Sequence, residues 1–172
     1  MRLLPLLLAL WATPGMAQQS DWERHNVRPD LGEEQPTAPP AYPRSDTLIE
    51  FGVSGSEFRF YIDGATLSVG SDGIVRYVLV ARSPSGVDNV SFEGMRCAGE
   101  YRPYALGRPD GTWAPSPGRW RATQRWHRAL LHEYFCPQTQ PIRDAAEGVQ
   151  ALRQGGHPFA RSLDAGNAAG RR

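Results

Sequence analysis

The chain has 172 residues, of which 40% are hydrophobic and 22% charged, a balance that fits one globular domain. Its formal net charge is +1, and arginine supplies all 19 of its basic residues. A charge this close to neutral argues against a nonspecific nucleic-acid binder, because such affinity depends on many cations meeting phosphates.

The N-terminus has the pattern of a cleavable secretory signal. Arg2 supplies a positive charge, an apolar run extends from Leu3 to Ala12, and the small residues Gly15 and Ala17 favour cleavage after position 17. The run is too short to cross a bilayer, which needs about 20 apolar residues. No cysteine stands directly after this apolar run, so we expect no lipid anchor. The sequence therefore predicts a periplasmic or secreted protein with no transmembrane segment after signal cleavage.

Composition divides the rest of the chain. The signal peptide would occupy residues 1–17, and residues 18–46 are predicted to be a proline-rich extended lead-in with few apolar side chains. Residues 47–154 carry the periodic patterns of a folded domain, and residues 155–172 are predicted to be a disordered tail.

Alternation of apolar and polar residues predicts the strands of this domain. Phe58, Phe60 and Ile62 alternate with polar residues, which is typical of a half-buried strand. Residues 74–82 are apolar on both faces in their middle, so this strand is expected to be central in its sheet. Further strands are predicted at residues 66–69, 90–97, 101–106 and 120–122.

The apolar phase changes within the strand that ends at Cys97. Val90 and Phe92 fall on one face, whereas Met95 and Cys97 fall on the other. A strand has a period of two, so a phase change indicates an extra residue. Gly94 stands at the change, and the pattern therefore predicts a β-bulge there.

Two helices are predicted after the strands. The first spans residues 124–135 with Thr123 as N-cap, and the second spans residues 141–154, from Pro141 to the stop at Gly155. The expected buried face of the first helix contains Trp126, His127, Leu130, Leu131 and Tyr134. The fold class is thus predicted to be α+β: a small antiparallel sheet of about four to five strands, with one or two C-terminal helices packed on one face.

Cys97 and Cys136 are the only cysteines in the chain. In an oxidising compartment the simplest interpretation is one disulfide, which would join the end of the first helix to the preceding strand. A redox-active or metal-binding pair is the alternative. However, active dithiols usually have C-x-x-C spacing, and two cysteines alone do not make a zinc site.

The stretch from Asp72 to Cys97, DGIVRYVLVARSPSGVDNVSFEGMRC, resembles the core of the cryptic neisserial protein-like family, a group of uncharacterised bacterial envelope proteins. The likeness covers about residues 42–136 and continues through Tyr104-Ala105, Trp113, Trp120 and Tyr134-Phe135-Cys136. The resemblance implies an envelope location and no particular activity. Some members look lipid-anchored, but this chain lacks the cysteine that such an anchor needs.

The sequence contains no recognisable catalytic or metal-binding constellation. His132 begins a stretch, HEYFC, that lacks the second histidine of a metalloprotease motif. A G-x-S-x-G elbow, a P-loop and a GxGxxG fingerprint are also missing. We therefore predict no catalytic residue, no metal site and no cofactor.

Charged and aromatic residues around the best strands supply the candidates for ligand or partner binding. Glu93 is expected to form a partly buried ion pair with Arg76 or Arg96, because buried charges need partners. Arginine and tryptophan interleave in residues 118–128, a surface that can receive sugar rings unless the tryptophans fill the core. The candidate binding residues are Arg76, Tyr77, Glu93, Arg96, Tyr104 and Trp113.

These observations favour a non-enzymatic periplasmic binding or interaction module, with a cell-wall glycan or an envelope protein as partner and no role in nucleic-acid binding. Two alternatives stay open. One is an envelope-associated hydrolase that uses Glu93 and neighbouring arginines, which requires a concave pocket containing Glu93 and a second acid or histidine within reach. The other is a purely structural envelope protein.

Overall fold

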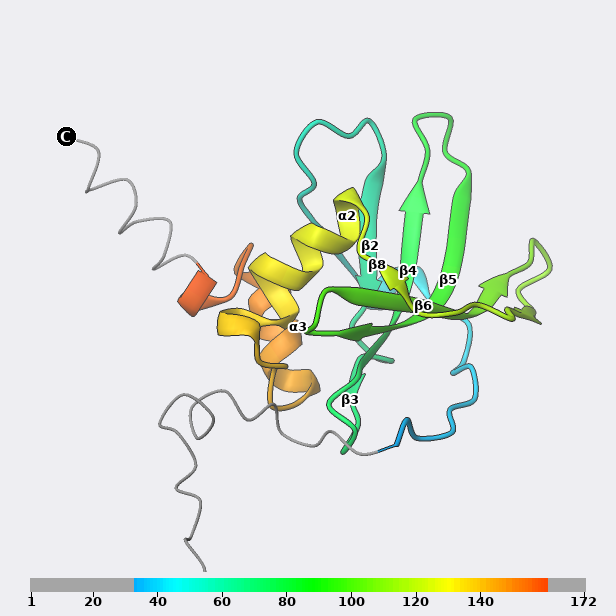
Figure 1. Cartoon of the computed structure of the whole chain (residues 1–172). Helices are drawn as coiled ribbons and strands as arrows, with labels where there is room; N and C mark the ends of the chain where they lie inside the picture. Colours follow the sequence, from blue (N-terminus) through cyan, green and yellow to red (C-terminus); the bar gives the residue numbers. More distant parts are fainter. Residues whose placement is uncertain (1–32, 161–172) are drawn as a thin grey trace, which may run out of the picture. The chain divides into compact units, whose positions relative to one another are not determined.

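A computed structural model describes residues 33–160, which form an eight-stranded antiparallel sheet with short helices packed on one face (Figure 1). The path through the sheet is β1-β2-β4-β5-β6-β7, with β3 beside β4 and β8 beside β6. The strands are β1 (Leu48–Phe51), β2 (Arg59–Asp63), β3 (Ser68–Val69), β4 (Val75–Arg82), β5 (Asp88–Arg96), β6 (Glu100–Gly107), β7 (Trp113–Pro115) and β8 (Arg121–Ala122).

The α+β class and the antiparallel sheet are confirmed, but the expected number of strands is wrong. The sheet has eight strands instead of four to five. β3 and β8 fall within predicted strands, but β1 and β7, of four and three residues, were not predicted. Segments this short show too few alternations for a period of two to stand out from the sequence. The predicted signal peptide, the start of the lead-in and the end of the predicted tail lie outside the described residues.

β4 is central, as predicted, and both of its faces are buried. Tyr77 and Leu79 belong to the apolar cluster under the helices, whereas Val78 and Val80 belong to a second cluster on the opposite face. The two apolar clusters therefore lie on opposite faces of β4.

The predicted bulge at Gly94 is wrong. β5 pairs with β4 without interruption. The phase change arises because Val90 and Phe92 pack into the second cluster, whereas Met95 packs into the cluster under the helices. The irregularity lies in β6, where Phe92 is opposite Ala105 and Glu93 is opposite Pro103, so that Tyr104 is the extra residue.

Gly94, on the neighbouring strand β5, leaves space for the extra residue of β6. A Cβ at this position would lie 2.5 Å from Tyr104 Oη and 2.8 Å from Cε2 of the same ring. The absence of a side chain therefore gives the Tyr104 ring its place over β5.

The first predicted helix is confirmed in its extent. α2 (Arg125–Ala129) continues into a π-helical turn, η2 (Leu130–Phe135). Its N-cap is Gln124 instead of Thr123, and no side chain caps it. The expected inner face is buried at His127, Leu130, Leu131 and Tyr134, while Trp126 is half-buried.

The second helix, α3 (Ala145–Arg153), begins four residues later than predicted. The Asp144 carboxylate accepts a hydrogen bond of 2.9 Å from Glu147 N, so Asp144 is the N-cap, and the helix does not start at Pro141. α3 packs against β1 and η2, with Ala151 and Leu152 in the same apolar cluster as β4. Short 3₁₀ turns, η1 (Ser45–Thr47) and η3 (Pro137–Thr139), precede β1 and follow η2.

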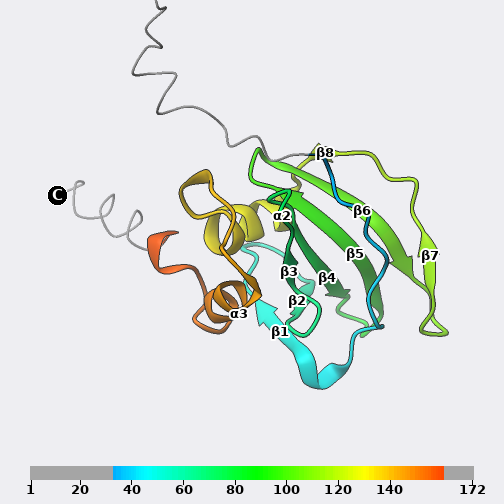
Figure 2. The same cartoon turned by 90° about the horizontal axis from the view of Figure 1, so that it is seen from below.

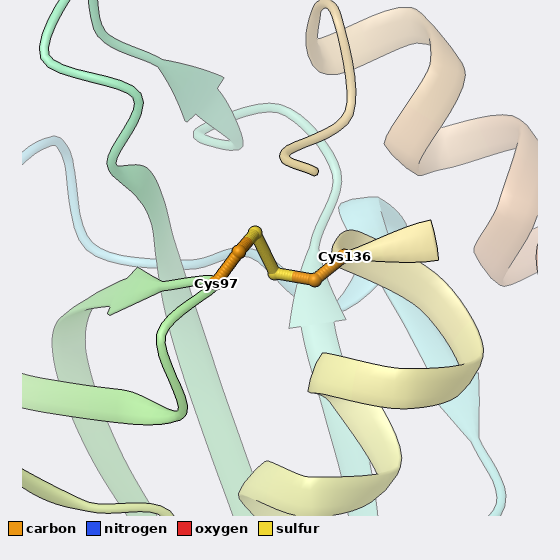
Figure 3. The surroundings of a disulfide bond; sticks show 2 residues. All are labelled: Cys97 and Cys136. Carbon is orange, nitrogen blue, oxygen red and sulfur yellow. A yellow bond between two sulfur atoms is a disulfide. The ribbon is translucent and has the colours of Figure 1, made fainter. Parts of the chain in front are cut away.

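The predicted disulfide is present and joins Cys97, directly after β5, to Cys136, directly after η2 (Figure 3). The two Cα atoms lie 5.5 Å apart. The bond ties the helical layer to the end of a central strand.

Within residues 33–160 none of the helices has both the length and the apolar character needed to cross a membrane.

Replacing both cysteines with serine should lower the free energy of unfolding by about 4 kcal/mol, the chain-entropy value for a loop of this length. Urea denaturation of the oxidised protein and of the Cys97→Ser/Cys136→Ser variant measures the difference. Reduced wild-type protein is the control and should match the variant. An unchanged midpoint would show that the bond carries no part of the stability.

Gly94→Ala should destabilise the domain by about 1–3 kcal/mol, because the new methyl group overlaps the Tyr104 ring. Gly52→Ala is the matched control, since no atom of a residue beyond its chain neighbours lies within 4 Å of its added methyl. Denaturant midpoints of both variants provide the comparison. An equal loss of stability in the two variants would contradict this account of Gly94.

Candidate functional site

A cavity of about 270 Å³ opens where α2 begins, beside β4, β5 and β6. Most of its wall is apolar, and the polar side chains of Ser91, Glu93 and His127 form a connected group in it. Its other lining residues are Leu79, Ala81, Asn89, Val90, Tyr101, Pro103, Leu106 and Trp126.

Glu93 is the centre of the polar group. It is 5% exposed and accepts hydrogen bonds from Tyr77 Oη at 3.1 Å and from Ser91 Oγ at 2.7 Å. His127 Nε2 lies 2.8 Å from the same carboxylate. Tyr77 stands directly opposite Glu93 on β4. Burial, and then the nearby Glu93, raise the pKa of Tyr77 well above its usual value, so the phenol keeps the proton that it donates.

The predicted ion pair between Glu93 and Arg76 or Arg96 is wrong. Arg76 is opposite Gly94, one residue out of phase with Glu93, and Arg96 is three residues further along β5. In regular strands these offsets put the arginines on the other face of the sheet. The carboxylate therefore finds its partners on the helix side.

His127 has the packing role expected of it. It is 1% exposed, and the Tyr101 ring stacks on it with centroids 3.6 Å apart. Its Nδ1 has no hydrogen-bond partner within the part of the chain that the structure describes. Sequence reasoning missed the Glu93–His127 contact, although a histidine on the apolar face of a helix must find a polar partner.

Aromatic rings continue from the cavity across the helix face of the sheet. Trp126 stacks on Phe60 at 5.8 Å with an angle of 19° between the planes, and Phe60 lies 6.4 Å from the exposed Phe58. The cavity thus lies at one end of an aromatic row that reaches the surface.

Four of the predicted binding residues lie on the opposite face, which is covered by residues 33–44. We call this extended segment the strap; it is drawn in blue and cyan on the side of the sheet away from the helices (Figure 2). Trp113 Nε1 donates to Pro40 O at 2.9 Å, and the Tyr42 ring packs on Trp113 at 5.2 Å. The strap is therefore anchored by aromatic contacts at its C-terminal end.

Arg76 makes a buried ion pair beneath the strap. Its two terminal nitrogens lie 3.0 Å and 2.6 Å from the Asp72 carboxylate, which also accepts from Gln35 N at 2.7 Å. Burial tends to raise the pKa of Asp72, but hydrogen bonds from Arg76 and from the backbone of Gln35 and Ile74 outweigh it and lower the pKa to about 2. Asp72 thus also binds the strap, through the backbone of Gln35.

The six candidates therefore fall into two groups. Tyr77 and Glu93 meet under the helices, whereas Arg76, Arg96, Tyr104 and Trp113 lie under or beside the strap. Within residues 33–160 no three histidine, cysteine, aspartate or glutamate side chains are arranged to hold a metal ion.

Fold and site together define a disulfide-linked α+β domain with a small pocket on the helix face and a strap across the other. The profile of the CNP1-like family matches residues 28–153, and the chain belongs to this family, as its motifs predicted. It is 26% identical to Cryptic neisserial protein 1 of Neisseria gonorrhoeae, in an alignment covering 88% of this chain and 81% of that protein. No solved structure matches the chain.

Glu93→Ala should lower the free energy of unfolding by about 3 kcal/mol or more, because it leaves buried donors without an acceptor. Tyr77→Phe should cost only about 1 kcal/mol, since it removes a donor and leaves Glu93 with two contacts. Glu57→Ala, on the exposed segment before β2, is the control and should stay within about 0.5 kcal/mol of wild type. Chemical denaturation measures all three; a Glu93→Ala variant as stable as the control would contradict the assigned role.

Proposed function

We propose that this protein is an exported, non-enzymatic binding module of the bacterial cell envelope, and that its pocket holds one ring of a cell-wall glycan. The observation that supports the proposal is the pocket itself: Tyr101 and Trp126 contribute aromatic rings to its wall, and Ser91, Glu93 and His127 contribute polar groups. Small-molecule sites are typically apolar cavities with a few placed polar groups. At about 270 Å³ the cavity is just smaller than drug-sized sites of about 300–1,000 Å³, which suits a single sugar ring.

The disulfide supports export. Disulfides form and persist in oxidising compartments such as the periplasm, and they are rare in the cytosol. The Cys97–Cys136 bond joins two elements of the core and is not a closely spaced pair of the redox-active kind. The signal-like pattern at the N-terminus favours the same location.

The hydrolase alternative has a pocket with Glu93 and a histidine in reach, but the order of contacts does not suit nucleophilic catalysis. In a serine triad the histidine lies between the hydroxyl and the carboxylate. Here Glu93 lies between Ser91 and His127, and each of its two oxygens already accepts a hydrogen bond. The arginines that were to assist it belong to the opposite face. Binding is therefore the better use of this pocket.

The glycan proposal is tested with the full chain, purified peptidoglycan and a soluble N-acetylglucosamine oligomer. Retention on peptidoglycan and saturable NMR shifts of the pocket residues are expected. Leu106→Glu, on the pocket wall, should weaken binding about tenfold or more, because a charge replaces an apolar contact.

Val87→Glu is the matched control for that test. Val87 is 60% exposed, does not line the pocket and undergoes the same change of charge, so this variant should bind as the wild type does. If the wild-type protein is retained no better than an unrelated protein, the glycan-binding proposal fails and the structural alternative gains.

A further inference from the structure

The Glu34 carboxylate of the strap is held by side chains from β5, from β6 and from the residue before β8. Arg102 Nη1 lies 3.1 Å and 3.0 Å from its two oxygens, and Trp120 Nε1 donates to one of them at 3.0 Å. Arg96 Nη2 lies 3.7 Å from the same oxygen. We call Arg96, Arg102 and Trp120 the carboxylate cradle. The Glu34 side chain remains 22% exposed, so this contact lies at the surface, where another group can replace it.

The cradle lies in an arginine-rich part of the surface. Arg96 stacks over the Trp120 ring at 4.0 Å, and its other carboxylate contact in the described chain, Glu100, is 3.9 Å away. Two further exposed arginines, at positions 119 and 121, flank Trp120. Burial tends to raise the pKa of Glu34, but the hydrogen bond from Trp120 and the charges of Arg102 and Arg96 outweigh it and lower the pKa. The surroundings of Glu34 thus favour a negative charge.

The strap lies on this face in the way that an extended peptide ligand binds. Gln35 uses its backbone, donating from N to Asp72 and accepting at O from Arg76 Nη2 at 3.1 Å. Side-chain anchors stand on either side of it, Glu34 in the cradle and Tyr42 against Trp113. Prolines at 36, 39 and 40 keep the intervening chain extended, which lowers the entropy lost on binding.

We infer that the carboxylate cradle is a docking site for an acidic, extended, proline-containing segment of a partner protein, and that Glu34 fills it while that partner is absent. This site is on the face opposite the glycan pocket and does not depend on it. Arg96 and Arg102 match a partner segment with a carboxylate in the position of Glu34. Recognition combines a carboxylate held by an arginine with backbone hydrogen bonds, and specificity comes from the aromatic anchor.

The test uses a synthetic peptide with the sequence of residues 31–43, LGEEQPTAPPAYP, and the full chain carrying Glu34→Ala and Tyr42→Ala, which removes both side-chain anchors of the strap. The peptide should bind this variant about tenfold or more tightly than a peptide with Glu34→Gln, because a charged hydrogen bond is lost. A peptide with Glu33→Gln is the matched control and should bind like the unchanged peptide. Adding Arg102→Gln to the protein should abolish the difference between the peptides.

A second measurement covers the case in which the double variant does not fold. In the single Glu34→Ala variant, propionate should shift the Trp120 indole NMR resonance saturably, whereas the neutral analogue propanamide should not. Peptide binding that is indifferent to Glu34→Gln, or a folded single variant that does not respond to propionate, would overturn the proposal. Glu34-dependent dimerisation of the wild-type chain would overturn it too, because the occupant would then be a second copy.

Discussion

The structure depends on the burial of β4 and β5 on both faces. A strand in this position can carry a polar side chain only if that side chain has a partner, because an unpartnered buried charge costs several kcal/mol, about 3–5 when one member of a buried pair is removed. The helices supply partners on one side through His127, and the strap supplies them on the other through Gln35. Each covering layer is thus held by the polar groups of the strands as well as by apolar contact.

The same constraint separates the two candidate sites. Residues of one parity in β4 and β5 face the helices and form the floor of the pocket, with Tyr77 and Glu93 as direct neighbours. Residues of the other parity face the strap, where Arg76 and Arg96 lie. The extra residue in β6 puts both Tyr104 and Ala105 into the apolar cluster under the strap. A single irregularity therefore sets how β6 contributes to each face.

The elements that could be predicted from the sequence are those with a long apolar pattern. β4, the helix from residue 125 to 135 and its buried face are all visible, because their apolar periodicity extends over eight residues or more. The disulfide could be predicted because the chain offers only one pair of cysteines. β1 and β7 could not, since four and three residues do not establish a period.

The wrong prediction of an ion pair between Glu93 and Arg96 is linked to the wrong prediction of a bulge at Gly94. A bulge at Gly94 would have changed the parity of β5 and brought Glu93 and Arg96 to the same face. Without the bulge they face opposite ways, and Glu93 needs a partner from the helix. The carboxylate cradle could not be predicted for a different reason. Glu34 lies 68 residues from Arg102 and 86 from Trp120, and no local sequence pattern links them.

The position of the disulfide has a consequence for both the pocket and the carboxylate cradle. The covalent ring closed by Cys97 and Cys136 contains β6, β7, β8 and α2. Tyr101, Trp126 and His127 of the pocket lie within that ring, and so do Arg102 and Trp120 of the cradle. A chain with free thiols lacks the covalent constraint on the segment that carries these five side chains. Oxidation of the two thiols to this one disulfide therefore constrains both surfaces together.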